Sequence, residues 1–251
     1  MDVTPSSGQG PSHPVPRAPN AVHSIGWVGR GWVGRGWVLL MAGMVALVAA
    51  CSEDLPGNVV VGSGDPTSET REVSAFTELD VGGGIGVDIV PGSATSIVVT
   101  AQPNILPLTT TTVDGGRLTI ATTRGYTTVH GISVKVTTSE LTAIALHGGA
   151  SASGDGFRAQ SLALNLSGGA HLDLSGEAKD LEVEASGGAV LQIGGLKLTT
   201  ARVDLSGGVV ATMSVSSALT GKASGGVVIN LDQRPPTVDV QTSGGAVVLG
   251  S

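Results

Sequence analysis

Apolar and polar residues alternate along the chain from about Val73 onward, and the alternation has a period of two. Val, Ile, Leu and Thr occupy every second position in short runs, and clusters of Gly, Ser, Asn or Pro separate these runs. Successive side chains of a β-strand point to opposite faces, so this pattern predicts half-buried strands. No amphipathic helix is predicted in this part of the chain. The sequence therefore indicates an all-β domain.

The first part of this β region is less regular than the second. Strands are expected at residues 79–81, 86–90, 96–100 and 117–120. Asp114, Gly115 and Gly116 precede the last of these strands, and this combination is typical of a tight hairpin turn.

A glycine pair recurs six times in the second part, at intervals of 18 to 20 residues. The first glycines of the pairs are Gly148, Gly168, Gly187, Gly207, Gly225 and Gly244. A fixed period of this length predicts a solenoid whose coils bury their apolar faces only by stacking on each other. A phosphate-binding glycine loop needs a following helix, whereas β-type sequence follows each pair here. We therefore expect the pairs to form the corners of the coils, where glycine accepts positive φ and allows close approach.

One repeat illustrates the expected coil. Residues 170–174 and 181–185 form two short strands, residues 175–180 form a turn between them, and residues 186–188 form the corner. The inward side chains of this and the neighbouring repeats are apolar: Ala170, Leu172, Leu174, Leu181, Val183 and Ala185, and also Leu162, Leu164, Leu166, Ala189, Leu191, Ile193, Val203, Leu205, Val227, Ile229 and Leu231. They would stack into one aliphatic core, which suits a chain with only 2% aromatic residues.

The first fifty residues have a different composition. Arg30 and Arg35 precede an apolar run at residues 37–50, which is too short to span a bilayer and is typical of a signal peptide. Residues 47–51 resemble a bacterial lipoprotein signal, in which Cys51 becomes the acylated first residue of the mature protein. The alternative is a secreted protein with an incidental thiol. Several acyl chains would anchor the protein stably, at about 0.8 kcal/mol per buried methylene.

The sequence thus predicts three segments. Residues 1–50 form a disordered leader plus signal peptide, residues 51–72 the acylated cysteine and a flexible tether, and residues 73–251 the solenoid, with regular coils from about residue 141. A translation start at Val28, Val33 or Val38 would give a signal of ordinary length. We expect an exported, membrane-anchored lipoprotein. In a cell with two membranes, Ser52 after the cysteine resembles an outer-membrane sorting signal.

Charge argues against one class of partner. From residue 52 onward the chain has 10 basic and 19 acidic side chains, hence a formal charge of 10 − 19 = −9. No basic stripe is visible, so nucleic-acid binding is not expected.

Candidate chemistry is sparse. His130, His147 and His171 are the only histidines of the mature domain, and neither a metal site nor a cofactor is predicted from them. His147 occupies the corner position that serine occupies in the other repeats. Two outward columns are expected, one of Asn165, Glu184, Asp204, Lys222 and Gln241, and one of Asp173, Gln192, Thr212 and Asn230. They are interpreted as solvated ladders with one favourable pair, Asp204 with Lys222. No Ser-His-Asp set is expected from the spacing, and no catalytic residue is predicted.

One further outward column is apolar. The positions directly after the corners are Ser151, His171, Val190, Val210, Val228 and Val247. The four valines, here called the valine strip, would form an exposed surface roughly 15 Å long at a strand spacing of about 4.8 Å. Such a strip suits docking or self-association. The alternative is that valine simply favours strands. End-to-end pairing through a final coil without a polar cap is another route to self-association.

Several segments resemble a known bacterial family. Residues 76–81, 84–90 and 113–120 are similar to the start of the putative auto-transporter adhesin, head GIN domain family. Residues 132–136 and 141–146 and the repeated Ser-Gly-Gly-Ala corners are similar to the rest of it, so the resemblance spans about 73–251. It implies a right-handed parallel β-helix-like solenoid with coils of 18–20 residues on an exported, often lipid-anchored protein. It carries over no catalytic residues.

The sequence therefore predicts a cell-envelope lipoprotein that presents a non-enzymatic β-solenoid for adhesion or surface interaction, with a glycan or protein partner. A polysaccharide-binding or polysaccharide-cleaving β-helix is one alternative. An inert envelope scaffold is another.

Overall fold

The computed structural model describes residues 59–250. The predicted signal peptide, Cys51 and residue 251 lie outside the described residues. The strands are β1 (Val60–Val61), β2 (Thr67–Arg71), β3 (Glu78–Val81), β4 (Ile85–Pro91), β5 (Ser96–Ala101), β6 (Thr109–Asp114), β7 (Arg117–Thr122), β8 (Tyr126–Thr127), β9 (Ile132–Thr138), β10 (Ala143–Leu146), β11 (Ser151–Leu166), β12 (His171–Ala185), β13 (Val190–Gly207), β14 (Val210–Gly225), β15 (Val228–Leu231), β16 (Thr237–Gly244) and β17 (Val247–Leu249). A short 3₁₀ helix, η1 (Leu106–Leu108), precedes β6. The described residues contain no helix with the length and apolarity needed to cross a membrane.

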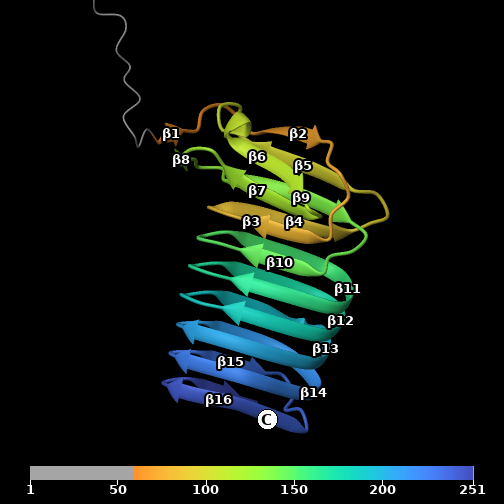
Figure 1. Cartoon of the computed structure of the whole chain (residues 1–251). Coiled ribbons are helices and arrows are strands. Elements are labelled where there is room, and N and C mark those ends of the chain that lie inside the picture. Colours follow the sequence, from red (N-terminus) through yellow and green to blue (C-terminus); the bar gives the residue numbers. More distant parts are fainter. Residues whose placement is uncertain (1–58, 251) are drawn as a thin grey trace, which may run out of the picture. The chain divides into compact units, whose positions relative to one another are not determined.

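The strands stack as parallel coils with two broad faces (Figure 1). One face, the β10 face, runs in the order β7, β3, β10, the second halves of β11 to β14, and β16. The other, the β4 face, runs in the order β9, β4, the first halves of β11 to β14, β15 and β17. The predicted all-β solenoid, preceded by a less regular β segment, is confirmed.

Apolar side chains from both faces fill the space between them. Leu164, Val183 and Val203 lie in register on the β10 face, and Leu172 and Leu191 lie in register on the β4 face. All five are buried, as the alternation of the sequence predicts. Burial of one such side chain contributes about 1.5 to 3 kcal/mol, but only while neighbouring coils cover it. The core is therefore shared by the stack and belongs to no single coil.

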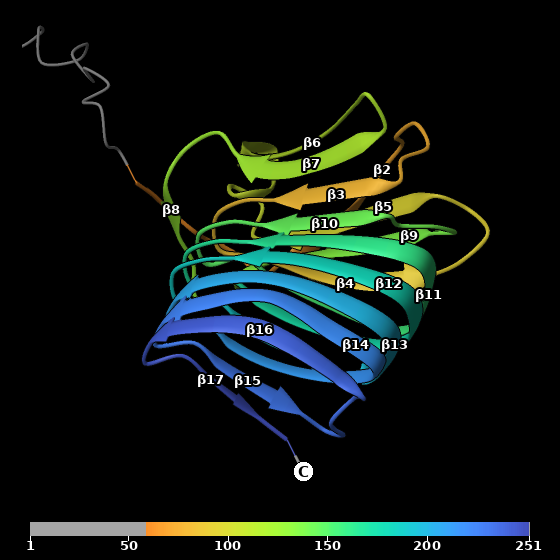
Figure 2. The same ribbon diagram turned by 60° about the horizontal axis from the view of Figure 1, so that its bottom comes forward.

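The segment predicted as a turn at residues 175–180 is instead part of a strand. β12 is continuous and shifts its register between Asp173 and Gly176. Figure 2 shows β11 to β14 bending from one face to the other. Ala178 is buried on this third side of the coil, in register with the buried Leu198. The prediction of two short strands was wrong because the polar segment pairs its backbone with neighbouring coils.

Glycine at the corners has a steric cause. The first glycines of all six pairs have positive φ, between 68° and 87°. A Cβ atom on Gly207 would lie 2.7 Å from the carbonyl oxygen of Gly187. That oxygen already accepts a hydrogen bond from Gly208 N–H at 2.6 Å. Any larger residue would therefore collide with the previous coil and strain its own backbone.

The N-terminal end of the stack uses antiparallel pairing. β5 pairs with β9 on one side and with β2 on the other, and β6 and β7 form a hairpin. Gly115 and Gly116 form its turn with φ of 57° and 83°. The four strands and the hairpin turn expected from the sequence are confirmed.

The predicted tether is too long at its C-terminal end. β2 lies within residues 51–72, yet it pairs with β5 along its whole length. The guanidinium of Arg71 donates to the carbonyl oxygens of Thr109 at 2.5 Å and Leu106 at 3.1 Å. These contacts tie a polar segment to the sheet although it has few apolar side chains of its own.

Candidate interaction surfaces

The valine strip lies on the β4 face. Val190, Val210, Val228 and Val247 pair in register on four successive coils. Val210 is 39% exposed and Val247 41% exposed, and the other two are partly exposed. Their role as an interaction surface stays a prediction, but the geometry gives them a common, accessible line.

The side chains beside the valine strip are uncharged. The next outward column of the same coils contains Gln192, Thr212, Asn230 and Leu249. Leu249 is 52% exposed. The outward positions of β15 and β17 and of the first halves of β13 and β14 therefore carry no charged side chain, but the carboxylate of Asp232, which directly follows β15, lies beside Gly194 of β13. In the preceding coil the corresponding positions are His171 and Asp173, which mark the boundary of these uncharged positions.

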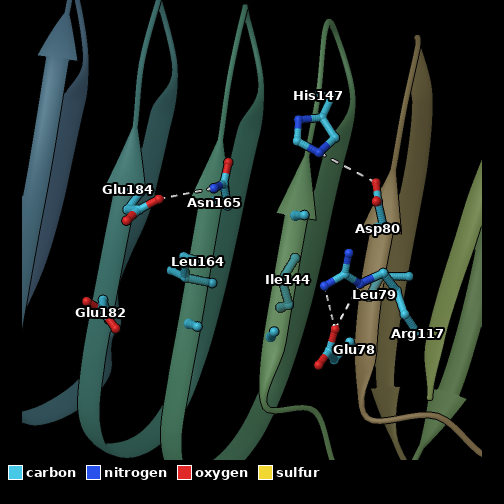
Figure 3. A pocket seen from close by; sticks show the side chains of 13 residues that line it. Glu78, Leu79, Asp80, Arg117, Ile144, His147, Leu164, Asn165, Glu182 and Glu184 are labelled. Carbon is cyan, nitrogen blue, oxygen red and sulfur yellow. Dashed lines mark hydrogen bonds and ion pairs between the residues drawn. The ribbon is translucent and has the colours of Figure 1, made fainter. Parts of the chain in front are cut away.

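The β10 face carries a groove of about 390 Å³ (Figure 3). Its floor contains the outward alanines Ala143 and Ala145 of β10 and Ala163 of β11. Methyl side chains on two adjacent strands leave a depression between longer side chains on the strands to either side. Sequence reasoning missed this groove, although three alanines at outward positions were its signal.

Carboxylates line both walls of the groove. Glu78 and Asp80 lie on β3, and Glu182 and Glu184 on β12. The walls are three strand spacings apart, or about 14 Å. Arg117 binds Glu78 at 2.8 Å, as Figure 3 shows. Arg202 Nε of β13 lies 3.9 Å from Glu182 Oε1, so the four carboxylates and two guanidinium groups leave the groove with a small negative balance.

Three polar side chains meet at one end of the groove. His147 Nδ1 lies 3.0 Å from Ser167 Oγ, and His147 Nε2 lies 3.6 Å from Asp80 Oδ1. The expectation that no Ser-His-Asp set would form is therefore wrong. β10 lies between β3 and β11, so the corner after β10 places His147 between residues that are far apart in the sequence. His171 lies apart from this set, in register with Ser151 and Val190.

The two predicted ladders are in register. Asn165, Glu184, Asp204, Lys222 and Gln241 form one column on the β10 face. The predicted ion pair within it is confirmed, with Lys222 Nζ 2.9 Å from Asp204 Oδ2. In residues 59–250 no three His, Cys, Asp or Glu side chains are grouped so that they could hold a metal ion.

The stacked parallel coils define a β-solenoid with two broad outward faces. Residues 75–235 match the profile of the family described as putative auto-transporter adhesin, head GIN domain. The chain belongs to that family, as its sequence resemblance indicated.

Comparison with crystal structures shows the same fold in one bacterial protein and weaker similarities to two others. A putative adhesin from Bacteroides fragilis is similar with a TM-score of 0.58 and 13% identity, over 75% of this chain and 98% of that one. A putative adhesin from Parabacteroides distasonis has a TM-score of 0.49 and 20% identity, over 76% and 99% of the two chains. A putative lipid binding protein from Parabacteroides distasonis has a TM-score of 0.48 and 15% identity, over 76% and 99%. No match was found among curated proteins.

Proposed function

We propose that this chain is an exported, lipid-anchored protein of the cell envelope whose solenoid acts by binding a glycan or protein surface. The single observation that carries the proposal is the valine strip, four exposed or partly exposed valines on successive coils beside an uncharged outward column. Membership of a family of putative adhesins supports the same kind of function.

The valine strip is rigid and apolar, and both properties favour association with a partner. Each Å² of apolar surface that binding removes from water contributes about 25 cal/mol to the free energy of association. Side chains on a stacked sheet lose little further conformational freedom when a partner covers them. The entropy cost of ordering therefore offsets less of this favourable free energy. The strip is small, and an interface of ordinary size would extend to the neighbouring Thr212 and Asn230.

Membrane anchoring has a direct test in Cys51→Ala. We expect the wild-type chain in the membrane fraction and the variant in the soluble fraction, because only the thiol of Cys51 would carry the acyl chains. Ser74→Ala, which leaves the predicted signal unchanged, is the control and should stay with the membrane. Retention of Cys51→Ala in the membrane would exclude the anchor.

Adhesion is tested on cells that display the chain and on cells that lack its gene. The two are compared for retention on immobilised glycans and on immobilised envelope or host proteins. We expect greater retention of the displaying cells on at least one class of surface. Equal retention on every surface would contradict an adhesive function.

A second candidate function is polysaccharide binding in the groove. The observation that favours it is the pair of walls with Glu78, Asp80, Glu182 and Glu184, which can accept hydrogen bonds from sugar hydroxyls along a shallow floor. A glycan array probed with the wild type and with Glu182→Gln/Glu184→Gln tests it. Binding that the double variant loses supports the groove, and binding that it keeps excludes it.

A further inference from the structure

One corner of the solenoid differs chemically from the others. The position before each glycine pair is serine at Ser167, Ser186, Ser206, Ser224 and Ser243, but it is histidine at His147. Ser167 N–H donates to the carbonyl oxygen of Leu146, so the two corners lie on adjacent coils. Ser167 is therefore the one corner serine that directly follows a histidine corner.

The contacts of His147 match those of a general base. Its Nδ1 lies 3.0 Å from Ser167 Oγ, and its Nε2 lies 3.6 Å from Asp80 Oδ1. With the proton on Nε2, the ring accepts a hydrogen bond from the Ser167 hydroxyl at Nδ1 and turns Nε2–H toward the Asp80 carboxylate, which at 3.6 Å acts as a nearby charge beyond hydrogen-bond distance. A nucleophile, a base and a group that orients the base thus stand in sequence.

A substrate has access to this set. Ser167 is partly exposed, the imidazole is 44% exposed, and the groove extends from His147 over Ala145. Asn165 lines the same groove two residues before Ser167, so both side chains lie on the outward side of β11 and its corner. The amide N–H₂ of Asn165 donates one hydrogen to Glu184 Oε2 at 3.4 Å, and its second N–H is a donor that can approach a carbonyl oxygen bound beside Ser167.

We infer that Ser167 is a nucleophile that accepts the acyl group of a small carboxylic ester, with His147 as its base and Asp80 as the positioning residue. The inference is independent of the adhesive function. The small negative balance of the groove disfavours anionic esters, so we expect an uncharged or cationic substrate.

The proposed reaction has two steps, acylation of Ser167 and hydrolysis of the acyl-serine. Ser167 Oγ attacks the ester carbonyl carbon while its proton passes to His147 Nδ1, and Asp80 stabilises the resulting imidazolium. The ester C–O bond breaks, and the leaving alcohol takes the proton from Nδ1. Water, deprotonated by the same nitrogen, then attacks the acyl-serine carbonyl carbon. The bond between that carbon and Ser167 Oγ breaks, Oγ takes the proton from Nδ1, and a carboxylic acid is released. The hydroxyl of Ser167 is restored.

The other corner serines provide controls within the same molecule. The full chain, purified in detergent, is exposed briefly to p-nitrophenyl acetate, and acetylation of each corner serine is measured by mass spectrometry of its peptides. We expect Ser167 to be acetylated about 100-fold faster than Ser186, the scale of general-base assistance. Acetylation of Ser167 no faster than Ser186 would overturn the inference.

His147→Ser separates base catalysis from structure, because serine is the residue that the other corners carry at this position. It should keep the fold, measured by circular dichroism, and lower acetylation of Ser167 to the rate of Ser186. Ser186→Ala is the matched control and should leave the rate at Ser167 unchanged. An unchanged rate at Ser167 in His147→Ser would also overturn the inference.

The pH dependence of acetylation tests the roles of His147 and Asp80. A rate that depends on a neutral imidazole falls in acid, so acetylation of the wild type at Ser167 should slow as the pH is lowered. In His147→Ser the rate at Ser167 should follow the shallower profile of Ser186. Asp80→Asn should lower the rate at Ser167 while the acid-dependent slowing remains. Identical profiles for wild type and His147→Ser would contradict the role of the base.

Discussion

The β10 face and the β4 face are built by the same coils, yet they present different chemistry to solvent. Both contribute aliphatic side chains to one core, and Leu164 and Leu172 are equally buried. Outward, the β10 face carries a groove with carboxylate walls and an ion pair between Asp204 and Lys222. The β4 face carries the valine strip and its uncharged neighbours.

This difference shows which positions the fold constrains. Inward residues must stack, and the first glycine of each corner has positive φ and little room for a Cβ, so both follow a strict repeat. Outward residues touch only their neighbours in the same column and are free to vary. Sites for partners are therefore expected on the outward columns, and the two faces are expected to have separate partners.

The largest expected effect is a loss of stability that unfolds both faces together. Gly207→Val places a Cβ 2.7 Å from the carbonyl oxygen of Gly187 at a φ of 87°. Backbone strain and overpacking together should destabilise the fold by about 3 kcal/mol or more. Gly115→Ala is the control, because its φ is also positive but no atom lies within 4 Å of the added Cβ. Thermal denaturation showing equal losses for the two variants would contradict close packing at the corners.

A second pair of variants tests whether the faces share one core. Leu191→Ala lies beneath the β4 face and Leu205→Ala beneath the β10 face, and both leucines are buried. Each variant should lower the free energy of unfolding by about 2 to 5 kcal/mol, and the two losses should be similar. Urea denaturation provides the measurement. A loss confined to one variant would indicate that the faces unfold separately.

The smallest effect concerns the charged ladder. Asp204 and Lys222 are 53% and 65% exposed at their side chains, so solvent screens their ion pair. A double-mutant cycle with Asp204→Asn and Lys222→Gln should give a coupling energy below about 1 kcal/mol that declines with salt. A salt-independent coupling of several kcal/mol would mean that the β10 face has a structural role beyond its groove.

Much of the fold follows from the sequence because two local rules act at every coil. Alternation places Leu172 inward and His171 outward, and positive φ reserves the corner for Gly187. The third side of the coil was not predicted, because the polar run around Gly176 has the composition of a turn. Only its register with the neighbouring coils shows that it is part of a strand. Ala178 and Leu198 carried the signal, but the register shift between coils hid their alignment.

The site was less predictable because it combines regular and irregular parts of the chain. The spacing of the corners places His147 one coil before Ser167, so the contact between these two residues could be predicted from the sequence. The approach of Asp80 depends on β3, which lies outside the periodic region and pairs with β10 across 65 residues. No period in the sequence indicates that Asp80 lies beside that corner. The alanine floor of the groove was likewise visible only after β10 and β11 had been aligned.

The central claim is that the valine strip is the binding surface, and matched charge variants test it most directly. Val210→Lys/Val228→Lys adds two charges to the β4 face, and Thr220→Lys/Gln241→Lys adds two charges to the outward columns of the β10 face. Adhesion of cells displaying each variant is measured on a surface that retains the wild type, after circular dichroism has shown that both variants fold. We predict that the valine variant loses adhesion and the β10-face variant keeps it. Equal adhesion of the valine variant and the wild type would contradict the claim.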